Sequence, residues 1–192
     1  MKRLISILFV SFLLLSYACV QCPTYPTDKL MYLPDTYSGK SLTYCSFEMN
    51  DSISFLCGSI KIEGKHSVAS DAKSCNTHAS QRLTNNNDSY ITYTNTANVF
   101  CSPCDGPWFF SIGVEMAAFG LRTTIHWDLP DSGLDIDHSD TPIFLPEWTA
   151  ADGTRYENVY HLAPDAETAL YLAPGLGIVQ IETSDKIYYL RQ

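Results

Sequence analysis

Hydrophobic and polar residues alternate with a period of two along much of the chain, the pattern of half-buried β-strands. In residues 121–127 the odd positions are Leu, Thr, Ile and Trp, and the even positions are Arg, Thr and His. In residues 110–116 the even positions Phe110, Ile112, Val114 and Met116 share one face. Each segment is predicted to be a strand with one face toward the core.

Shorter segments continue the pattern. Residues 53–57 alternate in odd register and residues 60–62 in even register, which predicts a bulge at Gly58-Ser59. Four more strands are predicted near the C-terminus, with a turn at Ser184-Asp185 between the last two, over residues 154–162, 168–172, 176–182 and 186–190.

Evidence for helices is thin. Residues 112–121 could form a helix, but Gly113 and Gly120 oppose it. Strands about every ten residues, separated by Gly, Asn and Pro, predict an antiparallel all-β domain.

The N-terminus has the pattern of an export signal. Lys2 and Arg3 precede an apolar run over residues 4–15, too short to span a bilayer comfortably. Ala18 and Cys19 follow, which predicts a signal peptide over 1–18 and a lipid-modified Cys19. Tyr17 departs from the small residue that lipoprotein signals prefer, so ordinary cleavage after Ala18 is the alternative. A tether is predicted over 19–36 and one β domain over 37–192.

The chain has seven cysteines, an odd number. If Cys19 carries lipid, the other six can form three disulfides in an oxidising compartment: Cys22, Cys45, Cys57, Cys75, Cys101 and Cys104. The pair Cys101 and Cys104 has the C-x-x-C spacing of a redox centre, but no βαβ pattern precedes it. A zinc site would need two further ligands, such as Cys75 and His78. Structural disulfides are the favoured interpretation of these cysteines, and no metal or cofactor is predicted.

Composition describes a globular, acidic protein. Apolar residues make up 45% and charged residues 17%. Loss of Lys2 and Arg3 with the signal would take the net charge from −9 to about −11. Such a surface repels nucleic acids and anionic lipid head groups, which argues against nucleic-acid binding.

Two other groups of residues are candidates for chemistry. The loop from Asp128 to Asp140 holds five Asp in thirteen residues, enough oxygen ligands for a cation, although the spacing fits no EF-hand. His126, Asp128 and a serine could form a hydrolase triad, but no G-x-S-x-G motif identifies a nucleophile. A solvated turn and a non-catalytic protein are the simpler interpretations.

The C-terminal segment resembles a known group of proteins. Residues 153–159 read GTRYENV, residues 171–180 read YLAPGLGIVQ, and residues 187–190 read IYYL. This order is similar to the closing segment of secreted Bacteroidetes lipoproteins of unknown function, the TapB-like group, and residues 37–44 resemble their opening strand. The chain departs from the pattern at Leu172, Gln180 and in its cysteine-rich middle. The resemblance implies a strongly twisted antiparallel sheet, a partial barrel like LolA and LolB.

The two glycines of this segment also have a physical explanation, which does not depend on the resemblance. Gly175 and Gly177 flank one residue, so the backbone there can bend or approach a neighbouring strand closely.

Together these features predict a disulfide-stapled, non-catalytic lipoprotein of the cell envelope, held at the periplasmic or outer-membrane surface by its N-terminal lipid. Its partner would be a hydrophobic or glycan ligand, bound on a concave aromatic face, or another envelope protein. The alternative is a thiol–disulfide oxidoreductase that uses Cys101 and Cys104.

Overall fold

The computed structural model describes residues 25–26, 30, 32–48, 51–69, 72–100, 108–128 and 142–192. One short 3-10 helix, Asp35–Tyr37, precedes twelve strands. The strands are β1 (Ser41–Ser46), β2 (Ser52–Cys57), β3 (Lys61–Ala69), β4 (Ala72–Thr84), β5 (Tyr90–Phe100), β6 (Trp108–Ala118), β7 (Leu121–Asp128), β8 (Ile143–Thr149), β9 (Arg155–Leu162), β10 (Ala169–Ala173), β11 (Gly177–Glu182) and β12 (Ile187–Arg191).

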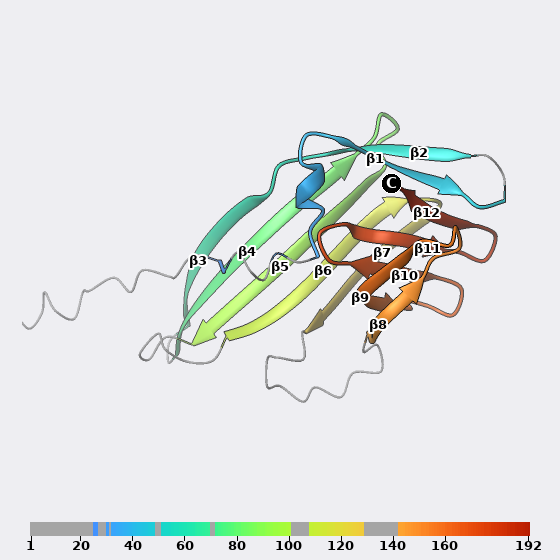
Figure 1. The fold of residues 1–192 in the computed structure, drawn as a ribbon. Helices are drawn as coiled ribbons and strands as arrows, with labels where there is room; N and C mark the ends of the chain where they lie inside the picture. Colours follow the sequence, from blue (N-terminus) through green and yellow to red (C-terminus); the bar gives the residue numbers. More distant parts are fainter. Residues whose placement is uncertain are drawn as a thin grey trace, which may run out of the picture.

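All strands belong to one antiparallel sheet that curls into a half-barrel (Figure 1). The order across the sheet is β7-β6-β5-β4-β2-β1-β12-β11-β10-β9-β8, and β3 pairs separately with β4. The predicted all-β antiparallel class and partial barrel are therefore confirmed. We call β3–β7 the N-terminal layer and β8–β12 the C-terminal layer; β1 and β2 join them.

The N-terminal layer follows the predicted alternation. In β6, Phe110, Ile112, Val114 and Met116 are all buried, and in β7 the odd positions are the less exposed ones. Residues 112–121 are strand and turn rather than helix. β2 ends at Cys57 opposite Leu83, and β3 begins at Lys61 opposite Ser80, so four steps along this side face three along β4. The one extra residue falls at residues 58–60, which agrees with the predicted bulge at Gly58-Ser59.

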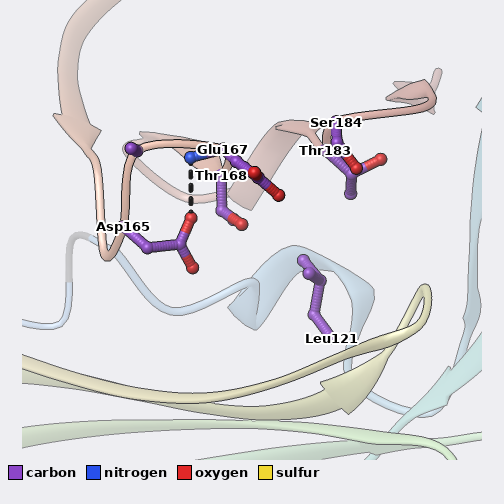
Figure 2. A pocket seen from close by; sticks show the side chains of 7 residues that line it. Leu121, Asp165, Glu167, Thr168, Thr183 and Ser184 are labelled. Atoms are coloured by element: carbon purple, nitrogen blue, oxygen red, sulfur yellow. Dashed lines mark hydrogen bonds between the residues drawn. The ribbon is translucent and has the colours of Figure 1, made fainter.

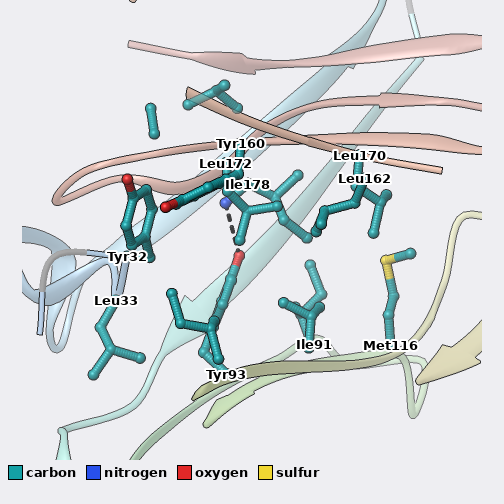
Figure 3. Close-up of a cluster of buried hydrophobic side chains, with 14 of the residues drawn as sticks. Tyr32, Leu33, Ile91, Tyr93, Met116, Tyr160, Leu162, Leu170, Leu172 and Ile178 are labelled. Atoms are coloured by element: carbon teal, nitrogen blue, oxygen red, sulfur yellow. Dashed lines mark hydrogen bonds between the residues drawn. The ribbon is translucent and has the colours of Figure 1, made fainter. Parts of the chain in front are cut away.

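The core lies where the two layers face each other (Figure 3). Ile91 and Tyr93 of β5 meet Leu170, Leu172 and Ile178 of β10 and β11, and all five are fully buried. Two tyrosines bond to the backbone of one residue of β11: Tyr44 donates to the Ile178 carbonyl at 2.9 Å, and the Ile178 N–H donates to the Tyr93 hydroxyl at 3.1 Å.

The β10–β11 turn explains why glycine stands at 175 and 177. Both residues have positive φ, of 71°. A Cβ on Gly177 would also lie 2.9 Å from the Tyr93 ring. The predicted bend and close approach are therefore both present, and they bring the Ile178 N–H within reach of Tyr93.

The segment before β1 is part of the core. Tyr32 and Leu33 are 3% and 0% exposed. Tyr32 donates to the Asn158 carbonyl at 3.1 Å, and Gln81 donates to the Pro34 carbonyl at 3.3 Å. Tyr32 and Leu33, within the predicted tether over 19–36, therefore pack against the β domain.

Candidate functional site

The cysteines depart from the predicted set of three disulfides. Cys45 and Cys57 are free thiols, whereas Cys75 is buried and is not free. Cys45 pairs with Ser52, and Cys57 lies five residues farther along β2, about 17 Å away at about 3.4 Å per residue. A disulfide needs Cα atoms about 4.4–6.8 Å apart, so these two cannot join each other. Because both thiols are free, two of the six cysteines predicted to form disulfides form none in this structure.

Cys57 is an unreactive thiol. It donates to the Pro34 carbonyl at 3.6 Å and lies 3.1 Å from the Gln81 amide nitrogen. Burial raises the pKa of Cys57 to about 11. Because the thiolate is the nucleophile, this environment suits packing rather than catalysis.

The structure separates two of the ligands that the alternative zinc site would need. Cys75 lies on the buried face of β4 with Thr77 and Ala79. His78 lies on the opposite face, where its Nε2 is 3.5 Å from the Glu63 carboxylate. The two side chains therefore cannot bind one ion. Among the described residues, no group of three or more His, Cys, Asp or Glu is placed to hold a metal.

The other candidate residues are placed only in part. Cys19, Cys22, Cys101, Cys104 and the acidic loop after Asp128 lie outside the described residues, so their roles stay predictions. His126 and Asp128 are exposed on β7, and Ser111 pairs with Asp128 across the strands. Within the described part of the chain no hydrogen bond joins the three side chains, so the pairing assembles no triad.

The free edge of β7 is the most unusual feature of the sheet. A two-residue turn with positive φ at Phe119 and Gly120 sets the hairpin register, with Ala118 opposite Leu121. Antiparallel alternation then directs the N–H and C=O groups of 121, 123, 125 and 127 to β6. Those of 122, 124, 126 and 128 point away from the sheet. No strand of the described chain pairs with them.

The face of β7 that points toward the core is also incompletely covered. Leu121 and Ile125 pack against the core but remain only partly buried, although the same positions on β6 are fully buried. A strand at the centre of a sheet would bury them through its neighbours on both sides. Within the described residues, the sheet therefore ends at β7 with one unpaired edge and a partly covered inner face.

One end of this edge opens into a hollow of about 390 Å³ (Figure 2). Leu121 forms its floor, and two loops of the C-terminal layer form the other side, contributing Asp165, Ala166, Glu167, Thr168, Thr183 and Ser184. Asp165 accepts from the Glu167 N–H at 2.9 Å, and this bond helps to lower the pKa of its carboxyl group. The hollow therefore combines apolar surface with the two carboxylates of Asp165 and Glu167.

The other end of the edge carries an aromatic cluster. The rings of Trp127 and Phe144 lie 6.2 Å and 5.5 Å from the ring of Tyr160, and the ring of Tyr32 lies 5.0 Å from it. Trp127 is only 5% exposed, and its indole Nε1 has no hydrogen-bond partner. Phe144 and Ile143 beside it are 46% and 56% exposed. Exposed apolar surface and a hydrogen-bond donor without a partner thus occur together at this end of the edge.

We call the strip from this cluster to the hollow, along the free edge of β7, the seam. The sequence assigned Trp127 correctly to the inner face of its strand. It gave no signal for the seam, because the position of a strand within a sheet order depends on pairings far apart in sequence.

A second aromatic group lies elsewhere in the C-terminal layer. Tyr171 is stacked between neighbours, with ring centroids 4.0 Å from Trp148 and 4.8 Å from His161. Burial raises the pKa of Tyr171 to about 12, with the Glu182 carboxylate adding to the effect. These three stacked residues are each only partly buried.

Comparison with known proteins adds no relatives: no family model, curated protein or solved structure matches the chain. Within the described residues, no helix has the length and apolar character needed to cross a membrane.

Proposed function

We propose that this chain is an exported, non-catalytic binding protein of the cell envelope, anchored through lipid on Cys19, whose ligand occupies the seam. Two independent sequence features support export and anchoring: the signal pattern over 1–18 and the Cys that follows Ala18. Two acyl chains on that cysteine are enough for stable attachment to a membrane.

The observation that carries the binding role is the unsatisfied indole N–H of Trp127. A buried donor without a partner costs about 1–3 kcal/mol, so native proteins rarely keep one. A ligand with an oxygen acceptor would remove this cost, and its apolar part would cover Phe144 and Ile143. Because Trp127 is almost fully buried, access requires a side-chain movement at the exposed rim, where Phe144 lies.

Nile red tests the binding role, because it is uncharged, largely apolar and carries a carbonyl acceptor. We expect saturable binding with a rise in dye fluorescence, weakened about two- to tenfold by Trp127→Phe, which keeps an aromatic ring but removes the donor. Trp148→Phe is the matched control and should bind as the wild type does. Absence of saturable binding, or equal affinity for Trp127→Phe, would refute the binding site at the seam.

The anchor is tested separately. Intact mass of the protein from membranes should show diacyl or triacyl addition at Cys19, with processing blocked by globomycin. A mature N-terminus without added mass would refute the anchor and leave the binding role standing.

A further inference from the structure

We infer that the seam takes an extended, basic segment of another polypeptide, which pairs with β7 as an added strand. The inference rests on the proposed function, because it names the class of partner that fills the same site. It is carried by the backbone of β7, by the different character of the other sheet edges, and by the charges along the seam.

The backbone of β7 presents a complete set of strand-pairing groups. The N–H and C=O groups of Arg122, Thr124, His126 and Asp128 point away from β6, and no described strand pairs with them. A peptide that adds to such an edge gains main-chain hydrogen bonds along its length. A small apolar ligand could satisfy Trp127 but would leave this row unpaired.

The other free edges carry features that discourage pairing. β8 contains Pro146, which has no N–H to donate. β3 carries Lys61, Glu63 and Gly64, all exposed. β7 has neither proline nor lysine nor glycine within its eight residues. β7 does carry the exposed charges Arg122 and Asp128, but every residue in it keeps a backbone N–H, so its outward hydrogen-bonding groups stay available to a partner strand.

The side chains on either side indicate what the added strand looks like. Its inward residues would cover Leu121 and Ile125, which calls for apolar side chains at alternate positions. Asp128 lies at one end of the seam and Asp165 and Glu167 at the other, against the single cation Arg122. The remaining positions therefore favour lysine or arginine. The same charges oppose a second copy of this acidic chain.

The experiment uses the mature chain and a capped ten-residue peptide of alternating lysine and valine. We expect one-to-one binding by calorimetry, displacement of Nile red, and weaker affinity at higher salt. Hydrogen exchange should slow at the amides of Thr124 and His126, which pair with no strand among the described residues. The amides of Thr123 and Ile125 already bond to β6 and should change little.

Two controls separate strand pairing from simple charge attraction. The same peptide with N-methyl groups on alternate residues of one edge keeps its charge and loses its donors, so its affinity should fall at least tenfold. Thr124→Pro removes an outward N–H without breaking a bond to β6 and should weaken binding similarly, whereas Thr124→Val should not. Circular dichroism checks that both variants fold.

The outcomes distinguish the two proposals. Equal binding of the methylated peptide, or no protection at Thr124 and His126, overturns strand addition. Saturable Nile red binding that the peptide does not displace also overturns it but leaves the binding role intact. If neither Nile red nor the peptide binds, both proposals fail.

Discussion

The hydroxyl of Tyr93 accepts a hydrogen bond from the backbone N–H of Ile178 at 3.1 Å, across the interface between the two layers. The residues are 85 positions apart in sequence. The peptide N–H of Ile178 has its partner on another layer rather than in the β10–β11 ladder, where the register shifts between Tyr171 and Leu172. Tyr93 thus supplies an acceptor beside this irregularity, where Val179 is the extra residue of β11 between the partners of Leu172 and Tyr171.

Removal of this hydroxyl should destabilise the protein. We expect Tyr93→Phe to lower the free energy of unfolding by about 1–3 kcal/mol, because it leaves the buried Ile178 N–H without an acceptor. Urea denaturation measures the change. Tyr90→Phe, on the same strand, loses only an exposed bond to Glu115 and should stay within about 0.5 kcal/mol of wild type. Equal effects of the two substitutions would contradict the role of Tyr93.

Two glycine substitutions separate backbone strain from steric overlap. Gly153 and Gly177 both have positive φ, but only Gly177 has a side chain within 4 Å of the added Cβ. Gly153→Ala should cost about 1–2 kcal/mol from the left-handed backbone alone. Gly177→Ala should cost about 1–3 kcal/mol more, because the Tyr93 ring must move. If overlap with Tyr93 did not matter, thermal or urea denaturation would show the same loss of stability for both substitutions.

Residues before β1 should contribute to folding stability. Leu33→Ala removes a side chain that is 0% exposed and should cost about 2–5 kcal/mol. Leu56→Ala, at a position that is 57% exposed on β2, is the matched control and should cost little. A neutral Leu33→Ala would mean that the domain does begin near residue 37.

Cys57 should make stability depend on alkaline pH. Its pKa is about 11 in the folded protein, against an ordinary value of 9.0, so the folded state holds the proton more tightly. The stabilisation is complete below pH 9 and is lost as the pH rises from 9 toward 11, because the unfolded chain ionises first.

Melting temperatures between pH 8 and 10.5 measure this effect. The Tm of wild type should fall more over this pH range than the Tm of Cys57→Ala. Both proteins retain the buried tyrosines, so the difference between them reports the Cys57 thiol. Cys45→Ala, on the neighbouring strand, is the control and should follow wild type. Parallel curves for wild type and Cys57→Ala would show that the Cys57 proton does not contribute.

The sequence predicted those strands whose two faces differ strongly. Residues 121–127, 154–162, 168–172, 176–182 and 186–190 all form strands, and Ser184-Asp185 is the turn between the last two. β4 and β5, the long strands at the centre of the N-terminal layer, were not predicted individually. Their inward faces include Thr77, Ala79, Gln81 and Asn95, which are buried but not strongly apolar, so the alternation is weak.

The candidate site was less accessible to sequence reasoning. Trp127 was assigned to the core by its odd position in the alternating pattern. Whether its indole N–H has a hydrogen-bond partner depends instead on which side chains surround it in space. Cys45 and Cys57 were included among the disulfide cysteines because six is an even number, whereas both are free thiols that the register of β1 and β2 keeps apart. Sheet order decides both results, and it is set by contacts between distant segments.

The pairing of β1 with β12 has a consequence for how the molecule is made. Ser46 lies opposite Tyr188, and Thr43 lies opposite Arg191, so the earliest strand completes its ladder with the latest one. Contacts of such long range slow folding, because the closure of a large loop comes first. Nascent chains emerge in order, and this ladder therefore cannot form until β12 has been synthesised.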